Sequence, residues 1–377
     1  MKNSGSIIAI IMVSILAMLV LLVGSIKKRP GEIETGATAD EQTVAETSAI
    51  DGDGDGEYRP EVTTVIVDSG RLIVGTDNGL YMMPLYRKAA DVKGDLIPQK
   101  RDLGDDVICL NAIIPLGEYR YGGGFGLYKL DSDYTTLFES HFPGETVNTL
   151  LEFGNGLLVG TDRGLWYHCD HPVDETGCVD TLLKDDVIVT AMALDQDGLW
   201  VGTYGDGLLY YDGLNWRERY LLRDTLSFAF VNALEFYYPY LWVGTDEAIY
   251  RYDGARWSQM FAADSSETYA VSNIMTTRAA TYIGTEDGLL KFASDSLKAV
   301  EDFHGMAIAG LCLNKKDVIV ATRRDGIFKF KGKEEIVSPE QLRLQVMAEV
   351  TNEEVLAETM PKVFAAGYRS VGRLTDK

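Results

Sequence analysis

The sequence predicts an all-β fold, a seven-bladed β-propeller, with an N-terminal transmembrane helix and a short, partly helical C-terminal tail. Three observations lead to this prediction: a phrase that recurs seven times, one long apolar run at the start, and a final stretch without any copy of the phrase. A repeat near forty residues with several short strands per copy is typical of a propeller. The expected organisation is an anchor with a basic flank (1–29), a disordered acidic linker (30–61), the propeller (62–337) and the tail (338–377).

The repeated phrase is an apolar pair, Val-Gly-Thr, two or three polar residues, and Gly-Leu-aromatic. Its fourth copy reads LWVGTYGDGLLYYDG from Leu199. Because a side chain at the glycine would collide with the neighbouring sheet, we expect this glycine to mark close approach between blades. These anchor positions lie 37 to 47 residues apart, at Gly75, Gly122, Gly160, Gly202, Gly244, Gly284 and Ala321.

Each copy supplies four short strands. In the fourth copy, the apolar run 187–194 predicts the innermost strand, followed by strands at 199–203 and 207–211. Asp212-Gly213 opens the next hairpin, because Asp-Gly readily adopts positive φ, and the alternating run 216–222 predicts a solvated outer strand. A single blade cannot bury both of its faces, so stacking seven blades creates the core.

The pattern LWVGTxxGL(Y/F)xYDG resembles the two-component regulator propeller repeat, and the resemblance extends over residues 62–337. It implies a propeller that serves as an extracytoplasmic sensor region, which in bacteria often precedes a hybrid histidine kinase. Nothing after the last copy resembles a kinase. The function expected is therefore a ligand- or protein-binding scaffold or sensor module.

The apolar run at 7–23 carries no charge, and residues 5–24 approach the roughly twenty residues that a bilayer core requires. An uncleaved anchor is expected, with a cleaved signal peptide as the alternative. Lys27-Lys28-Arg29 follows the run, and the positive-inside rule would leave the ring in the cytoplasm. The short leader, the family resemblance and a cysteine pair favour the opposite orientation. We therefore expect a single-pass protein of the bacterial inner membrane with its ring in the periplasm.

The cysteine pair is Cys169 and Cys178, whose spacing suits a disulfide across a long loop in an oxidising compartment. The other two cysteines, Cys109 and Cys312, lie in apolar innermost strands and are expected to be inert core residues.

Two segments are rich in metal-ligating residues. The segment DGDGDG at 51–56 resembles the start of a calcium loop, but its twelfth position, which requires an acid, is Val62. A flexible linker is therefore favoured there. The loop from His168 to Cys178 offers a zinc alternative, although a solvent loop with a disulfide is favoured because zinc sites usually combine two close pairs. No metal and no cofactor are expected. The loop's candidate ligands are His168, Cys169, Asp170, His171, Asp174, Glu175 and Cys178.

The turns between second and third strands are acidic. Ring symmetry predicts that they share one face near the channel mouth, where they would form a site for a cation or a basic partner. The alternative is turn chemistry, since Asp beside Gly makes a good turn, but the face should be negative in either case. These residues are Asp77, Asp162, Asp206, Asp246, Glu286 and Asp325.

Four aromatic residues fill a turn on the opposite face, in the segment 236–240. Tyr237, Tyr238 and Tyr240 are predicted to bind a protein partner or a glycan, because aromatic side chains concentrate binding energy. The alternative is that they cover the edge of a blade.

Composition and motifs exclude several functions. The net charge of −22, without a basic stripe, argues against nucleic-acid binding. The chain has four histidines and lacks Gly-x-Ser-x-Gly, His-Glu-x-x-His and P-loop motifs, so no catalytic residue is predicted. The alternative function is that of a propeller-fold glycan hydrolase or lyase.

The last copy has only a weak outer strand, at 334–337. The alternating run 342–350 is therefore expected to complete the ring as a strand, while Ser338 to Gln341 could instead cap a helix.

Overall fold

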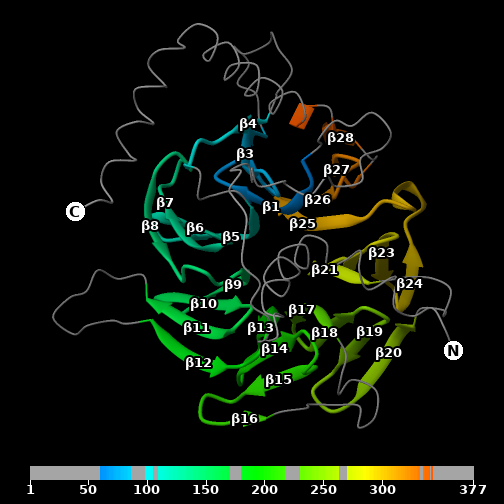
Figure 1. Ribbon diagram of the computed structural model, residues 1–377. Coiled ribbons are helices and arrows are strands. Elements are labelled where there is room, and N and C mark those ends of the chain that lie inside the picture. Colours follow the sequence, from blue (N-terminus) through cyan, green and yellow to red (C-terminus); the bar gives the residue numbers. More distant parts are fainter. Residues whose placement is uncertain are drawn as a thin grey trace, which may run out of the picture. The chain divides into compact units, whose positions relative to one another are not determined.

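The structure, a computed structural model, describes residues 60–85, 98–104, 109–169, 180–217, 230–262, 270–331, 334–339 and 341–342. The chain divides into two compact units, Met1–Tyr58 and Arg59–Lys377, and every described residue belongs to the second. These residues form seven antiparallel four-stranded sheets arranged around an axis (Figure 1). The predicted seven-bladed β-propeller is confirmed.

Each blade uses four consecutive strands, counted from the axis outward. Blade one contains β1 (Val62–Asp68), β2 (Arg71–Thr76), β3 (Gly79–Pro84) and β4 (Gln99–Lys100). Blade two contains β5 (Leu110–Leu116), β6 (Tyr119–Gly124), β7 (Gly126–Leu130) and β8 (Leu137–His141). Blade three contains β9 (Val147–Phe153), β10 (Gly156–Thr161), β11 (Gly164–Cys169) and β12 (Thr181–Asp185). Blade four contains β13 (Val189–Leu194), β14 (Leu199–Thr203), β15 (Leu208–Tyr211) and β16 (Trp216–Arg217).

The remaining blades follow the same order. Blade five contains β17 (Val231–Tyr237), β18 (Tyr240–Thr245), β19 (Ala248–Tyr252) and β20 (Trp257–Ala262). Blade six contains β21 (Val271–Thr276), β22 (Thr281–Thr285), β23 (Gly288–Ala293) and β24 (Ser296–Ala299), and a short 3-10 helix, η1 (Glu301–Phe303), follows it. Blade seven contains β25 (Ile308–Asn314), β26 (Asp317–Thr322), β27 (Ile327–Lys329) and β28 (Glu334–Val337).

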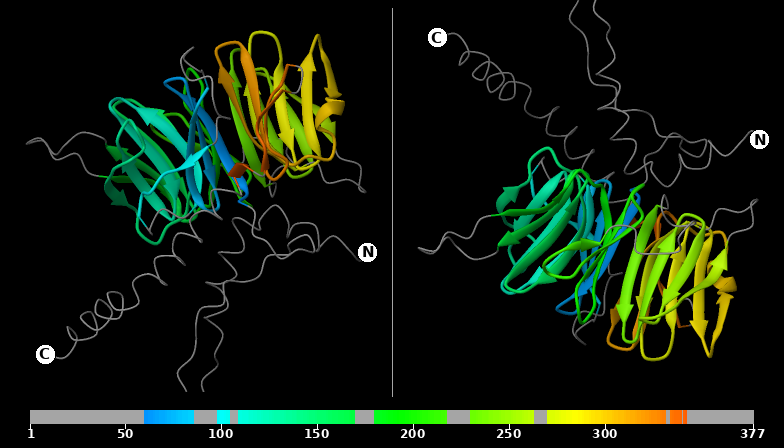
Figure 2. Two further views of the ribbon diagram at one scale, coloured as in Figure 1. Left: turned by 90° about the horizontal axis from the view of Figure 1, so that it is seen from above. Right: turned by 90° about the horizontal axis from the view of Figure 1, so that it is seen from below.

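The core lies between the blades. The innermost strands contact one another in a closed circle, β1 to β5, β9, β13, β17, β21, β25 and back to β1. Seven apolar clusters of buried residues each join two neighbouring blades, as Trp200 of blade four packs with Tyr250 of blade five. Figure 2 shows the sheets standing side by side when the ring is seen from its edge. Burial between stacked sheets therefore stabilises the ring, as expected for a repeat protein.

The anchor glycine allows this close stacking. A Cβ added at Gly202 would lie 2.6 Å from Cγ1 of Val231, the first residue of the next innermost strand. Gly160 stands in the same relation to Val189, at 2.5 Å. The predicted role of the glycine is confirmed. In blade seven the position is taken by Ala321, which is fully buried against blade one.

The second copy requires a correction of one residue. Ala112 pairs with Gly123, just as Thr64 of blade one pairs with Gly75. Gly123, and not Gly122, is therefore the anchor, and Gly124 takes the place of the threonine. Three consecutive glycines hid this register in the sequence, because they offer no side chain that distinguishes the positions.

A repeated hydrogen bond links neighbouring blades around the axis. The second residue of an innermost strand donates a side-chain hydrogen bond to the carbonyl of the first residue of the next such strand. Asn111 donates to Val147 at 3.1 Å, and Asn148 donates to Val189 at 2.9 Å. Thr63, Thr190 and Ser272 make the equivalent bonds. In blade seven this position is Ala309, whose side chain cannot donate.

The junction of blades seven and one, called the seam below, uses other contacts. The Val62 amide donates to the Arg323 carbonyl at 3.0 Å. Leu342, which is 2% exposed, packs into the cluster shared by the two blades. The predicted ring-completing strand at 342–350 is wrong at its start, because β28 is the fourth strand of blade seven and Leu342 is helical. Residues 343–350 lie outside the described residues.

The alternative interpretation of the tail, a helix cap, is confirmed where the structure describes it. The Ser338 amide donates to Oε1 of Gln341 at 2.8 Å, and the Gln341 amide donates to Oγ of Ser338 at 3.3 Å. This reciprocal pair is a capping box, which satisfies the first free amides of a helix. It turns the chain so that Leu342 reaches the seam.

Candidate functional site

The turns between second and third strands share a hydroxyl bridge. In blade five, Oγ1 of Thr245 donates to the Ala248 carbonyl at 3.1 Å and accepts from the Ala248 amide at 2.9 Å. Buried threonines make the equivalent bond to the carbonyl that ends the turn in every blade except the second. Successive strands of an antiparallel sheet run in opposite directions, so these turns share one face of the ring, called the Thr-turn face below.

The predicted acidic residues follow these threonines. Asp77 and Asp162 are half-buried, and each accepts a backbone amide of its own blade, from Glu61 at 2.8 Å and Thr146 at 2.9 Å respectively. Asp206 is exposed. These bonds support the turn-chemistry interpretation for Asp77 and Asp162, because their carboxylates hold the ends of their own sheets together.

Asp246 and Glu286, also half-buried, differ from the others in their electrostatics. Burial raises the pKa of Asp246, and its neighbour Glu247 adds to the shift. Burial likewise raises the pKa of Glu286, although Arg323 opposes the shift by donating to Oε1 at 2.7 Å. Desolvation therefore dominates at both carboxyl groups.

Two arginines interrupt the acidic face at the seam. Nε of Arg323 lies 4.0 Å from Oε2 of Glu61, and Nε of Arg324 donates to Oε1 of the same glutamate at 2.8 Å. Arg323 also binds Glu286, so one chain of ion pairs links blades six, seven and one. The Thr-turn face is therefore partly neutralised at this side, and four of the charges satisfy one another.

The aromatic turn lies on the opposite face, formed by the hairpins between first and second strands and called the hairpin face below. Tyr237 pairs with Tyr240 across the β17–β18 hairpin, with Tyr238 at its tip. Tyr238 is 70% exposed and Tyr237 is 40% exposed. Tyr240 is packed instead: the Arg251 guanidinium lies 4.4 Å from its ring centre, and the ring contacts the core between blades five and six. The structure thus separates two presented rings from one that covers a blade edge.

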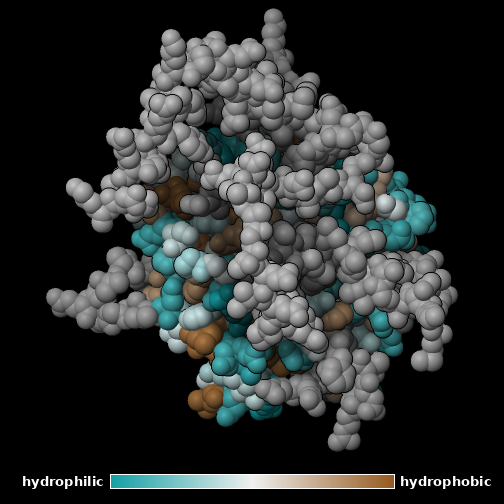
Figure 3. Space-filling view, in the orientation of Figure 1, coloured by the Kyte–Doolittle hydropathy of each residue, from teal (hydrophilic) through white to brown (hydrophobic). Residues whose placement is uncertain are grey.

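Other exposed large hydrophobic side chains among the described residues come from several blades, and they include Phe138, Leu182 and Leu214. In Figure 3 the coloured part of the surface shows hydrophilic and hydrophobic areas interspersed. Phe153, on the hairpin of blade three, is the counterpart of the tyrosines and is 48% exposed.

In the described part of the chain, the cysteines are two free thiols and one disulfide-bonded residue, as the sequence predicted. Cys109 and Cys312 are free thiols, and burial raises the pKa of each to about 12. Both therefore stay protonated and unreactive at neutral pH. Cys169 is disulfide-bonded, and its predicted partner Cys178 lies outside the described residues, as do Asp170, His171, Asp174 and Glu175.

Sequence reasoning missed a polar cluster between blades two and three. Nδ1 of His168 lies 2.8 Å from Oδ1 of Asp180, and Nδ1 of His141 lies 3.8 Å from Oδ2 of the same carboxylate. Burial alone would raise the pKa of Asp180. The hydrogen bond with His168, the charge interactions with His168 and His141, and the hydrogen bond from the Cys169 amide together lower it below its usual value. No local motif reveals this cluster, because its members come from β8, β11 and the residue just before β12. Only correct stacking of the repeats brings them together.

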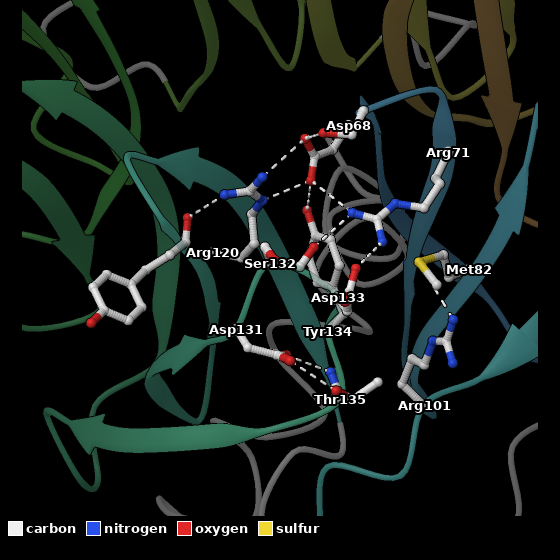
Figure 4. Close-up of polar contacts among 12 residues, drawn as sticks. Asp68, Arg71, Met82, Arg101, Arg120, Asp131, Ser132, Asp133, Tyr134 and Thr135 are labelled. Atoms are coloured by element: carbon white, nitrogen blue, oxygen red, sulfur yellow. Dashed lines mark hydrogen bonds and ion pairs between the residues drawn. The ribbon is translucent and has the colours of Figure 1, made fainter.

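A second polar cluster, shown in Figure 4, joins blades one and two on the hairpin face. The buried Asp68 carboxylate accepts from Nε of Arg120 at 2.7 Å and from the Tyr134 hydroxyl at 3.1 Å. Arg71 lies 3.6 Å away and binds Asp133 at 2.8 Å. Burial alone would raise the pKa of Asp68, but the bond from Arg120 holds it below its usual value. Because its charges are mutually satisfied, this cluster is a structural link between the blades.

A cavity of about 210 Å³ lies between blades five and six. Met260, Phe261 and Leu289 line it, and Asp287 and His304 stand among its polar residues, 3.7 Å apart. No pair of carboxylates lines this cavity, which a glycosidase of the usual two-acid type would require.

The comparisons with known proteins agree with the geometry. The family model described as two component regulator propeller matches residues 183–205, which contain β13 and β14. The resemblance to this repeat family is confirmed. No curated protein matches the chain.

Solved structures show the same fold at low identity. The WD40 β-propeller domain of Doa1 is 11% identical with a TM-score of 0.52, over 72% of this chain and 92% of that chain. A chain of the Mitotic Checkpoint Complex is 12% identical with a TM-score of 0.51, over 79% and 98%. The extracellular domain of the one component system BT4673 from B. thetaiotaomicron is 16% identical with a TM-score of 0.36, over 74% and 47%. The first two show the propeller fold alone.

The membrane anchor predicted at 1–29 lies outside the described residues. Within them, no helix has the length and apolar character needed to cross a bilayer.

Proposed function

We propose that this propeller is a binding scaffold or sensor module that captures a protein or glycan partner on its hairpin face. The observation that carries the proposal is the pair Tyr237 and Tyr238, which stand exposed at the tip of a tight hairpin. The ring of Tyr240 beneath them is fixed by Arg251. Presented aromatic rings on a rigid support lose little entropy on binding, which is typical of interface hot spots.

The proposal includes a location. The apolar run at residues 5–24 would hold the protein in a bacterial inner membrane, with the ring on the periplasmic side and a Cys169–Cys178 disulfide. The repeat-family match and the sequence of the run support this arrangement. Mass spectrometry of unreduced peptides from native membranes tests the disulfide, and protease access in spheroplasts tests the side of the membrane. Free thiols together with protease resistance would contradict the periplasmic location.

The binding role is tested with the full chain in detergent. Membrane extracts are passed over wild-type protein and a Tyr237→Ser/Tyr238→Ser variant, and bound proteins and glycans are quantified. We expect at least one partner to be depleted about 10-fold or more by the variant, since a buried aromatic anchor contributes about 2 kcal/mol or more. Phe153→Ser is the matched control, because it removes an exposed ring from another hairpin of the same face.

Three outcomes bear on the scaffold proposal. Equal capture by wild type and the double variant contradicts the tyrosine site. Unfolding of the double variant would show that the rings are core cover. Turnover of a polysaccharide by pure wild-type protein would favour the alternative function of a glycan hydrolase or lyase.

A further inference from the structure

The cluster between blades two and three combines residues from three strands. His141 ends β8, His168 lies in β11, and Asp180 immediately precedes β12. One ligand atom from each of the three lies within 4.8 Å of the other two. The side chain of His168 is 4% exposed, while those of His141 and Asp180 are 26% and 30% exposed. The cluster is therefore closed on its inner side and open toward solvent on the other.

The contacts around His141 orient its ring. Nε2 lies 3.1 Å from Oε2 of Glu139, so a proton on Nε2 is donated to that carboxylate. The lone pair of Nδ1 then faces Oδ2 of Asp180 at 3.8 Å, too far for a hydrogen bond. With the ring proton on Nε2, a metal ion placed between these two atoms would meet a lone pair from each of them. A carboxylate on the far nitrogen is the usual outer partner of a metal-binding histidine.

We propose that His141, His168 and Asp180 form a binding site for Zn²⁺ that ties blade two to the outer hairpin of blade three. Two imidazoles and one carboxylate form a three-ligand set that leaves a fourth position for water or another ligand. Ligand atoms in a tetrahedral zinc site lie about 3.3 Å apart, given zinc–ligand distances near 2.0–2.1 Å. The separations of 2.8 and 3.8 Å from the Asp180 carboxylate bracket this value, and all three ligand atoms lie within 4.8 Å of one another, so zinc binding would draw the three side chains closer together.

The proposed site differs from the zinc loop that the sequence suggested as an alternative. That loop would use Cys169 as a ligand, but Cys169 is disulfide-bonded and cannot supply a thiolate. His168 is a ligand in both sites, but in the proposed site the other ligands are His141 and Asp180 instead of residues of the loop. Zinc would take the place of the proton shared between His168 and Asp180, and it would add a link to His141 in the neighbouring blade. The disulfide-bearing hairpin would then be fixed to blade two when zinc is bound.

The test uses the full chain, purified in detergent and stripped of metal with a chelator. The protein is titrated with Zn²⁺ by calorimetry, the bound metal is counted by mass spectrometry after gel filtration, and the melting temperature is recorded with and without Zn²⁺. We expect one zinc per chain and a higher melting temperature. Substitution with Co²⁺ should give visible bands of a tetrahedral site without thiolate charge transfer. Mg²⁺ should not bind, because it prefers oxygen ligands and octahedral geometry.

Variants locate the site. His141→Ala and Asp180→Asn should each weaken zinc binding 100-fold or more, and both positions are open enough for the variants to fold. Glu139→Gln should weaken binding about 10- to 100-fold through the outer shell. His304→Ala is the matched control, because it removes an exposed histidine that lies 3.7 Å from Asp287. It should leave zinc binding unchanged.

Several results would overturn the proposal. Absence of stoichiometric zinc from the wild-type chain would show a purely hydrogen-bonded cluster. Binding that survives His141→Ala but disappears in His171→Ala would assign the metal to the loop. A Co²⁺ spectrum with thiolate bands would do the same. If a variant fails to fold, as judged by circular dichroism, the wild-type protein still tests the proposal through its zinc stoichiometry and its Co²⁺ spectrum.

Discussion

Single residues at repeated positions determine how closely neighbouring blades of this ring pack. The anchor glycine was predictable because its repetition in an apolar strand implies close approach, and the added-Cβ distances to the next blade agree. The polar residue at the second position of the innermost strands was not predicted. Its signal is present as Thr63, Asn111, Asn148, Thr190 and Ser272, but a polar residue in an apolar strand does not reveal its acceptor in another blade. The candidate site shows the same limit, since no spacing links His141 to Asp180.

At this scale the structure predicts a pH effect from Glu235, on β17. Burial raises the pKa of Glu235 to about 7, although the Thr276 amide, 3.3 Å away, lowers it. An unfolded glutamate titrates near 4.3, so between about pH 4.3 and 7 the folded protein binds the extra proton. Stability contributed by this group is present below about pH 4.3 and is lost as pH rises to about 7.

Glu235→Gln should therefore raise the free energy of unfolding at pH 8 relative to wild type by about 1–3 kcal/mol, with less gain at pH 5. Denaturant unfolding at the two pH values measures this. Glu152→Gln, an exposed glutamate near the end of β9, is the control. Identical pH slopes for wild type and Glu235→Gln would show that Glu235 is not the group responsible.

At the scale of the element, each blade is a contiguous sheet, and each of the first six blades meets the next through a glycine and an apolar strand start. Strand order and the fourth blade's second strand, 199–203, followed from the sequence because turn chemistry and apolar alternation are local properties. Strand ends were less accurate: β13 begins at Val189 instead of 187, and the outer strand is described only for Trp216–Arg217. Outer strands have one solvated face, so their apolar pattern is weaker.

The contact between blades four and five can be measured by a double-mutant cycle. Gly202→Ala places a methyl group 2.6 Å from Cγ1 of Val231, which should destabilise the ring by about 1–3 kcal/mol. Val231→Ala alone should also destabilise it, through a cavity. Combined, the two changes should cost at least about 0.5 kcal/mol less than their sum, because the second makes room for the first. Additive costs in urea unfolding would mean that the two residues do not collide.

At the scale of the whole molecule, the seam is the part that repetition did not predict. Ala321 replaces the anchor glycine, and Ala309 replaces the polar residue that hydrogen-bonds to the next innermost strand. At the seam, the ion pairs of Glu61 and the packing of Leu342 link the two blades instead. The sequence suggested an extra strand here because residues 342–350 alternate. The capping box at Ser338 turns the chain just before this run, so that Leu342, its first residue, is helical and packs into the seam.

Two truncations separate the seam from the rest of the tail. Deleting residues 338–377 removes Leu342 and should lower the stability by about 2–5 kcal/mol, the usual cost of removing a buried leucine. Deleting only residues 343–377 keeps Leu342 and should leave the melting temperature close to that of the full chain. Scanning calorimetry of the three proteins checks this. Equal melting temperatures for the two truncations would show that Leu342 does not stabilise the closed ring.

The way the seventh blade is built has a consequence for synthesis. Because all four strands of every blade come from one continuous stretch of chain, no strand made early has to wait for a partner made last. Each sheet can pair as it leaves the ribosome or an export channel, and exposed strand edges, which invite aggregation, are short-lived. A ring locked by an N-terminal strand would hold its last sheet incomplete until both ends met. This chain needs only the docking of finished sheets.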